Sequence, residues 1–102
     1  MPAVDSARWG KVQRMTYTVV VLKERDGRYS VVVPALPGCT TWGESVPETL
    51  DMVKEAILAY FDGLEELGRP IPPDVQPVTF DLGDATEASV YRVSVKEAAA
   101  VA

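Results

Sequence analysis

The stretch from Val31 to Leu50, VVVPALPGCTTWGESVPETL, most constrains how this chain can fold. Its first residues favour a strand, and that strand must stop at Pro34, because proline has no N–H to offer a sheet ladder. Pro37 and Gly38 follow as a rigid turn, and the β-prone residues after them predict a short strand that Gly43 ends. The stretch therefore predicts a strand, a turn and a second strand that leads directly into a helix.

The helix begins with a strong cap. Ser45 and Glu48 form a capping box, in which each side chain accepts a hydrogen bond from the other residue's backbone N–H. Pro47 falls in the first turn, where its missing donor costs little. Apolar residues recur every three or four positions over residues 46–67, and Gly68 is a typical stop. The pattern predicts one long amphipathic helix.

Residues 16–24 and 28–33 predict a β-hairpin, since both are rich in β-branched residues. The dipeptide Asp-Gly at 26–27 is typical of a two-residue type I′ loop, and such a loop pairs Leu22 with Val31. The second face of this hairpin is also apolar, so it must be covered by the tail of the chain, another copy or a different protein. We therefore expect partner contacts from four residues of that face: Tyr17, Val19, Val21 and Val32.

The predicted helix is longer than the predicted sheet is wide. Such a helix measures about 33 Å, whereas three or four strands span about 15–20 Å. The helix should overhang the sheet, and its last apolar residues then need another surface: Phe61, Leu64 and Leu67. Both features favour a homo-oligomer, a dimer or a tetramer. The late strand is the candidate for pairing between copies, unless it covers its own sheet.

Acidic residues mark the outer face of the helix, among them Asp51, Glu55 and Asp62. Acids near a helix start are favoured by the helix dipole, but those near its end are not, and like charges four residues apart slightly oppose the helix. The pattern is compatible with an ordinary solvated surface. It is also compatible with a docking face for a basic partner, and the sequence leaves both interpretations open.

The remaining segments are less regular. Residues 1–14 show no periodicity and are expected to be a flexible leader. Residues 69–77 contain four prolines and predict an extended connector, followed by a short strand over 78–82. Residues 89–96 alternate well and predict a late strand. The expected fold is α+β: a small antiparallel sheet, made of the hairpin and a short third strand, with one long helix packed on it and a C-terminal strand.

The composition argues against catalysis. The 102 residues contain no histidine and a single cysteine. Without histidine the commonest general base and metal ligand is missing, and the thiol of Cys39 has no partner to activate it. We therefore predict no enzyme activity, no catalytic residues, no metal site and no cofactor.

The net charge of −5 narrows the choice of partners. An acidic chain binds nucleic acid poorly, because phosphate contacts need clustered lysine and arginine, whereas a basic protein is attracted to it. No apolar run approaches the roughly 20 residues of a membrane span. A lone cysteine cannot form an internal disulfide, so a cytoplasmic location without membrane contact is expected.

The chain resembles the HicB-type antitoxins. The matching residues are the strand from Tyr17 (YTVVVL), the turn DGRY from Asp26, and the stretch VPALPGCTTWGES from Val33. The resemblance continues through the helix to residue 73, so that residues 15–73 form a HicB-like domain and residues 74–102 a connector and C-terminal strand. Its most specific part is the turn and helix start: Pro34, Leu36, Pro37, Gly38, Cys39 and Gly43, with Ser45 and Glu48 at the cap.

The resemblance implies a partial ribonuclease-H-like fold without catalysis. It also implies a partner, a small basic HicA-type toxin that cleaves messenger RNA and that the antitoxin neutralises. Many members add a DNA-binding segment, but no such pattern follows Pro73 here, so direct DNA binding is not expected. The alternative is an orphan, homo-oligomeric HicB-like regulatory protein without a toxin partner.

Overall fold

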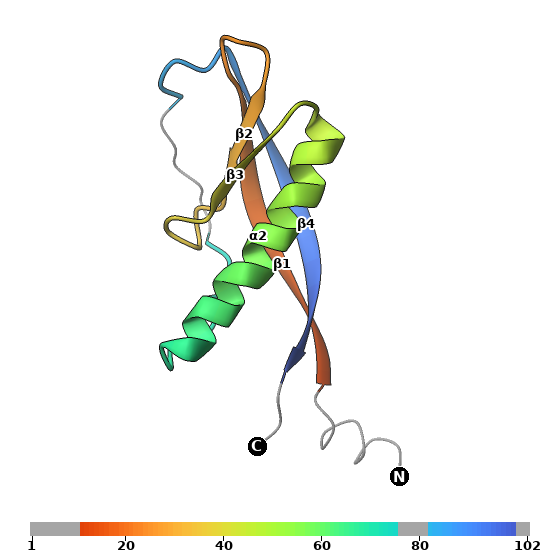
Figure 1. Ribbon diagram of the computed structural model, residues 1–102, viewed down its shortest axis with the longest axis vertical. Coiled ribbons are helices and arrows are strands. Elements are labelled where there is room, and N and C mark those ends of the chain that lie inside the picture. The colour runs from red at the N-terminus through yellow and green to blue at the C-terminus, as the bar shows by residue number, and fades with distance from the viewer. Residues whose placement is uncertain (1–10, 76–81, 100–102) are drawn as a thin grey trace.

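The computed structural model describes residues 11–75 and 82–99 (Figure 1). A four-stranded antiparallel sheet has the strand order β3-β2-β1-β4, and one helix, α2, crosses one of its faces. The predicted α+β fold is confirmed. The strands are β1 (Lys11–Lys23), β2 (Tyr29–Val32), β3 (Thr40–Gly43) and β4 (Glu87–Ala99), and α2 spans Val46–Glu66.

The first strand starts earlier than the sequence pattern indicated. β1 begins at Lys11 because residues 11–14 pair with the end of β4, so the flexible leader predicted over 1–14 is wrong for these four residues. Residues 1–10 lie outside the described residues, and so does most of the short strand predicted over 78–82. The late strand is confirmed, and β4 lies beside β1 of its own chain over 13 residue pairs.

The hairpin between β1 and β2 has a three-residue loop, so the two-residue type I′ loop is wrong. The backbone N–H of Glu24 donates to the carbonyl of Arg28 at 2.8 Å, and Gly27 takes a φ of 92°. This geometry is typical of a turn followed by a glycine bulge. The register shifts by one residue, and Val31 lies opposite Val21 instead of Leu22.

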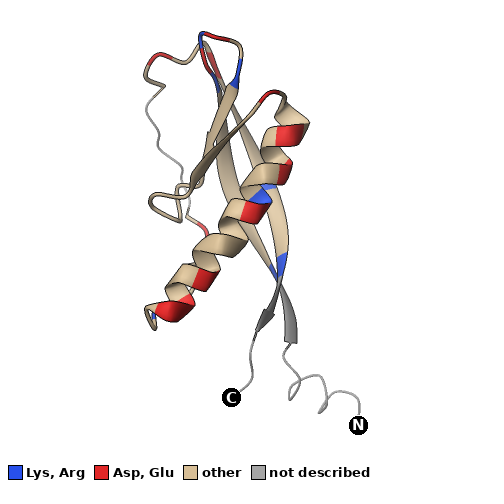
Figure 2. Ribbon diagram, viewed as in Figure 1, with Lys and Arg blue, Asp and Glu red and all other residues tan. Residues whose placement is uncertain are grey.

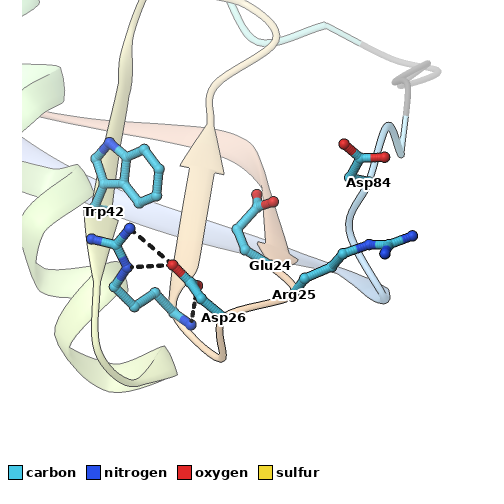
Figure 3. A pocket seen from close by; sticks show the side chains of 6 residues that line it. Glu24, Arg25, Asp26, Trp42 and Asp84 are labelled. Carbon is cyan, nitrogen blue, oxygen red and sulfur yellow. Dashed lines mark hydrogen bonds and ion pairs between the residues drawn. The ribbon is translucent and has the colours of Figure 1, made fainter.

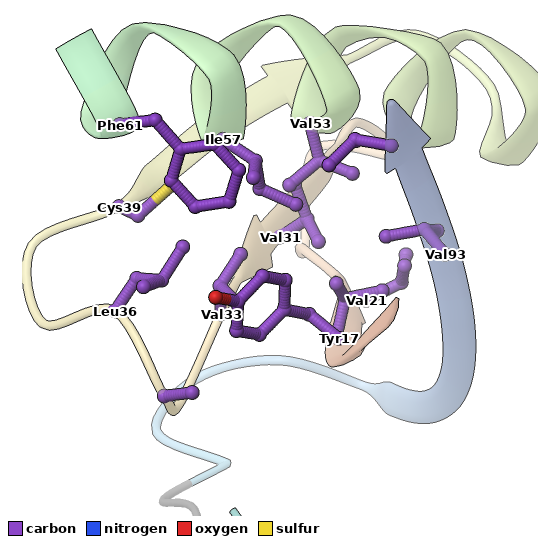
Figure 4. Packing of buried hydrophobic residues seen from close by; sticks show 13 residues of the cluster. Tyr17, Val21, Val31, Val33, Leu36, Cys39, Val53, Ile57, Phe61 and Val93 are labelled. Atoms are coloured by element: carbon purple, nitrogen blue, oxygen red, sulfur yellow. The ribbon is translucent and has the colours of Figure 1, made fainter. Parts of the chain in front are cut away.

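The shift decides which residues face the helix. Val21 and Val31 now share the inner face of the sheet with the side chains two and four residues away along β1. Figure 4 shows these residues packed against α2 in one buried cluster. Its members are Tyr17, Val19, Val21, Val31, Val33, Ala35, Leu36, Cys39, Val53, Ile57, Phe61, Val93 and Val95.

The end of α2 is covered by the turn after β2. Phe61 is only 2% exposed and its ring lies 6.0 Å from that of Tyr17, with Leu36 and Cys39 beside it (Figure 4). The overhang predicted for the apolar end of the helix is therefore wrong for Phe61. Leu64 is half-buried, and only Leu67, 67% exposed, fits the expectation.

Two consecutive turns shape this cover. The N–H of Leu36 donates to the carbonyl of Val33, which places Pro34 second in the first turn, where its fixed φ fits. The N–H of Cys39 donates to the carbonyl of Leu36, which places Pro37 and Gly38 at the centre of the second turn. Gly38 has a φ of 86°, as a type II turn requires, and the turn predicted at Pro37 and Gly38 is confirmed.

The helix ends follow the predicted caps with one change. The hydroxyl of Ser45 accepts from the N–H of Glu48 at 3.2 Å, but the Glu48 carboxylate accepts from the N–H of Glu44 rather than that of Ser45. At the other end, the N–H of Arg69 donates to the carbonyl of Leu64, a Schellman closure around a left-handed Gly68. The helix bounds predicted from the sequence are thus confirmed to within one residue.

Candidate protein-interaction surface

Three of the four sheet residues expected to contact a partner are unavailable. Tyr17, Val19 and Val21 are at most 2% exposed because α2 covers them, so their assignment as partner-binding residues is wrong. Val32 lies on the opposite, outer face of the sheet, level with Val20, and is half-buried. The exposed part of the outer face is therefore the sheet surface open to a partner.

The connector after the helix closes one part of the outer face. Asp74 accepts two hydrogen bonds from Thr18, one from its N–H at 3.0 Å and one from its hydroxyl at 2.8 Å. The N–H of Thr18 is free to donate to Asp74 because β2 ends at Val32 and the chain turns away at Pro34, so that β2 offers no carbonyl opposite Thr18. The residue before Thr18 also contacts the connector, because the hydroxyl of Tyr17 donates to the carbonyl of Pro72 at 2.5 Å.

The carboxyl group of Asp74 is held in its charged form. Burial alone would raise the pKa of Asp74, but the hydrogen bonds from Thr18 lower it, and so does the charge of Arg92, whose guanidinium lies 4.0 Å away. The pKa of Asp74 is therefore below its usual value. Thr18 and Val20 beside it are buried, so this part of the outer face belongs to the core of the protein.

A shallow hollow of about 290 Å³ lies near the hairpin tip on the same face (Figure 3). Trp42 from β3 is half exposed at its edge, and the guanidinium of Arg28 lies 4.9 Å from its ring centre. The carboxylate of Asp26 accepts hydrogen bonds from the backbone N–H and from the Nε of Arg28, and these bonds hold Arg28 in place. These hydrogen bonds lower the pKa of Asp26, and the one from the backbone N–H has the larger effect. The hollow is lined by Glu24, Arg25, Asp26, Arg28, Trp42 and Asp84.

The acidic face of α2 is exposed. Asp51, Glu55 and Asp62 all point to solvent, and Figure 2 shows acidic residues along the length of the helix. Among the described residues, no ion pair joins these three carboxylates to a base. The helix contains one lysine, Lys54, so the face carries a strong negative charge. A surface of this kind attracts a positively charged protein.

Two features of the described residues bear on metal binding and thiol chemistry. Within residues 11–75 and 82–99, no three histidine, cysteine or acidic side chains are grouped to hold a metal ion. Cys39 is buried, and burial raises the pKa of its thiol, which keeps it protonated and unreactive. None of the helices described is long and apolar enough to cross a membrane.

Several residues of this surface were not singled out by the sequence patterns. Thr18 and Asp74 come together across 56 residues of chain, and no periodicity links them. The contact between Arg28 and Trp42 depends on the pairing of β2 with β3. The one available signal was the isolated acid, Asp74, in a connector otherwise rich in proline.

Solved structures with a similar fold include HicB antitoxins. The chain superimposes on the HicB antitoxin of Burkholderia pseudomallei with a TM-score of 0.56 and 26% identity, over 78% of this chain and 61% of that protein. Its isolated N-terminal domain matches with a TM-score of 0.52 and 24% identity, over 76% of this chain and 95% of that domain. A chain of the HicA3–HicB3 toxin–antitoxin complex matches with a TM-score of 0.57 at 18% identity, over 79% of this chain and 98% of that chain, which shows the fold alone.

Relatives are also found by sequence. A UPF0150 protein of Thermoplasma acidophilum is 50% identical over 60 residues, which are 59% of this chain and 87% of that protein. A second UPF0150 protein, from Archaeoglobus fulgidus, is 46% identical over 48 residues, 47% of this chain and 70% of that protein. Residues 17–99 match the family described as HicB_like antitoxin of bacterial toxin-antitoxin system, a range that includes β4. The chain therefore belongs to the HicB-like antitoxin family.

Proposed function

We propose that this protein binds and neutralises a small, basic, HicA-type toxin and has no nuclease activity of its own. The observation that carries the proposal is the exposed acidic face of α2, whose three carboxylates form no ion pair with any described residue. Ordinary solvated helices usually intersperse both signs of charge, whereas this face presents one sign over several turns. The family and the presence of a HicA3–HicB3 complex among proteins of similar fold support the choice of partner.

In this proposal, charge sets the rate of association and apolar contact supplies most of the affinity. Opposite charges speed the encounter of two proteins and fade with added salt, because exposed charges are screened beyond about 8–10 Å. Affinity comes chiefly from buried anchors. Met52 and Leu58 flank the acidic residues on α2 and are 40% and 37% exposed, so they are the apolar groups closest to the docking face.

A charge reversal tests the docking face. The triple variant Asp51→Lys, Glu55→Lys, Asp62→Lys should associate with the toxin about tenfold more slowly at low salt, and the difference should vanish at high salt. All three residues are exposed, so the melting temperature should stay within a few degrees of the original. Association rates with a HicA-type toxin, measured in stopped flow at two salt concentrations, give the result.

A matched control changes the net charge equally but elsewhere. Glu44→Lys, Asp84→Lys, Glu87→Lys reverses three exposed acids away from this face and should slow association much less. Equal slowing by both variants would show that only net charge matters and would remove the docking face. Failure of the unaltered pair to co-purify at low salt, or of the antitoxin to restore growth, would favour the orphan, homo-oligomeric regulator instead.

A further inference from the structure

The hydrogen-bonding direction of β4 follows from contacts on the other side of β1. In an antiparallel strand, the N–H and C=O of one residue point to one edge and those of the next residue to the other. Thr18 in β1 directs its N–H away from β4, to Asp74. Glu24, the residue after β1, also directs its N–H away from β4, to Arg28. The alternate residues of β1 therefore bond to β4, and in β4 these bonds fall to the odd-numbered residues.

The even-numbered residues of β4 consequently point their N–H and C=O groups out of the sheet. No described strand pairs with this edge, because β4 is the last strand in the order β3-β2-β1-β4. The edge is 13 residues long and contains neither proline nor glycine, whereas β3 at the other edge has four residues. Proteins commonly protect a long open edge with proline, bulges or a covering segment. The outward-pointing residues include Val90, Arg92, Ser94 and Lys96.

We propose that β4 pairs antiparallel with β4 of a second copy of this chain, about a two-fold axis at Val93. Charge excludes two neighbouring registers, because like charges directly opposite destabilise a ladder. An axis at Arg92 would set two guanidinium groups against each other, and an axis at Ser94 would set Arg92 against Lys96. The axis at Val93 sets Arg92 against Ser94, which carries no charge.

Apolar packing disfavours a further register, the one with its axis at Tyr91. An axis at Tyr91 would set the carboxylate of Glu87 against Val95, a buried core residue. The axis at Val93 instead sets Val93 against its own copy and Tyr91 against Val95. These three residues belong to the helix side of β4, so the buried cluster of one copy would continue into that of the other. Tyr91, only half-buried in one chain, would gain cover.

Charge argues against a basic toxin as the occupant of this edge, whereas a second copy, which carries the same bases, is favoured by the apolar match of Tyr91, Val93 and Val95. The exposed bases Arg92 and Lys96 lie on β4, while the acidic face lies on α2. A basic protein would be repelled at β4 and attracted at the helix. The pairing therefore leaves the proposed docking face open, and it does not rest on the proposed function.

A cysteine at the axis tests the register. Val93 faces β1 with its hydrogen-bonding groups, so its pair across the axis is a non-hydrogen-bonded one with Cα atoms about 4.5 Å apart, within disulfide range. Full-length Val93→Cys should form a covalent dimer under mild oxidation, seen on a non-reducing gel. The matched control Ser89→Cys should not, because residue 89 pairs with residue 97 and its two copies lie about 27 Å apart. Cys39 is buried and common to both variants.

Sedimentation supplies a second readout. The unaltered protein should be a dimer at tens of micromolar. Val90→Pro removes an outward N–H and no bond to β1, so it should give a folded monomer, whereas Ser89→Pro removes the bond to Val21 and should unfold the chain. A monomeric unaltered protein overturns the proposal, and so does equal crosslinking at positions 89 and 93. The crosslinking result stands even if Val90→Pro fails to fold.

Discussion

The two faces of the sheet are closed in different ways. On the inner face, the periodic apolar side chains of α2 bury a valine-rich surface, and many small contacts share the stabilisation. On the outer face, Asp74 holds the connector to Thr18 with two hydrogen bonds, and Trp42 and Val90 remain half exposed. We therefore expect the inner face to tolerate most exchanges of one apolar residue for another, except where two backbones are in contact. The outer face depends instead on single polar contacts.

The largest effect is expected where the inner face has no space. A Cβ built on Gly43 would lie 2.2 Å from the Oγ1 of Thr49 and 2.8 Å from its backbone nitrogen. Thr49 is buried in the first turn of α2, where its hydroxyl donates to the carbonyl of Ser45. Gly43→Ala must displace the helix start and should lower the free energy of unfolding by about 3 kcal/mol. Urea unfolding followed by circular dichroism measures the loss.

Gly63→Ala is the matched control for this substitution. A Cβ at Gly63, in the last turn of α2, meets nothing within 4 Å, and alanine favours the helix more than glycine by about 0.5–1 kcal/mol. This variant should be slightly more stable than the original protein. Equal stability of Gly43→Ala and Gly63→Ala would show that the contact between β3 and α2 is not tight.

A smaller loss is expected at the turn that covers Phe61. Gly38 has a φ of 86°, but a Cβ there would meet nothing within 4 Å, so only backbone strain opposes a side chain. Gly38→Val should lower the free energy of unfolding by more than about 1 kcal/mol, and Gly38→Asn by less, because asparagine tolerates a positive φ. A melting temperature for Gly38→Val equal to that of the original protein would contradict the prediction.

The outer face provides the smallest effect and a pH signature. Asp74→Asn keeps the shape of the side chain but removes the negative charge of the carboxylate that accepts both hydrogen bonds from Thr18. The free energy of unfolding should fall by about 1 kcal/mol at pH 7. The pKa of Asp74 is lowered in the folded protein, so its contribution is present above its unfolded pKa of about 3.9 and is lost as pH falls through the folded pKa.

The stability difference between the two proteins should therefore close as pH falls below about 4. Thermal unfolding of both proteins between pH 7 and pH 2 checks this, and the other carboxylates cancel because both chains share them. A difference that stays constant over the whole range would mean that the charge of Asp74 does not hold the connector.

Local signals predicted the elements well. The cap at Ser45 and the stop at Gly68 gave the helix bounds, and Pro34, Pro37 and Gly38 gave the turn. The hairpin register failed because Asp-Gly fits a two-residue loop as well as a three-residue loop with glycine last. That one-residue difference, with the face chosen by α2, put Tyr17, Val19 and Val21 in the core instead of at a partner surface.

The outer face could not be derived in the same way. Its contacts join residues far apart in sequence, and neither Thr18 nor Asp74 stands in a repeating pattern. Which copy or partner β4 would meet was equally open, because alternation along a strand indicates its faces but not its neighbours. The acidic face of α2 was visible in the sequence because its spacing is that of a helix, and its role as a docking face stays a prediction.

The pairing of β1 with β4 has a consequence for the speed of folding. Lys23 and Glu87 are 64 residues apart in the chain, and Lys11 and Ala99 are 88 apart, yet each pair is adjacent in the sheet. Long-range pairing of this kind slows folding, because the chain loses most of its freedom before these contacts form. During synthesis, β1, β2, β3 and α2 emerge first, and their shared core lacks Val93 and Val95 until the last strand arrives. The time needed to complete the protein is therefore set by its final strand.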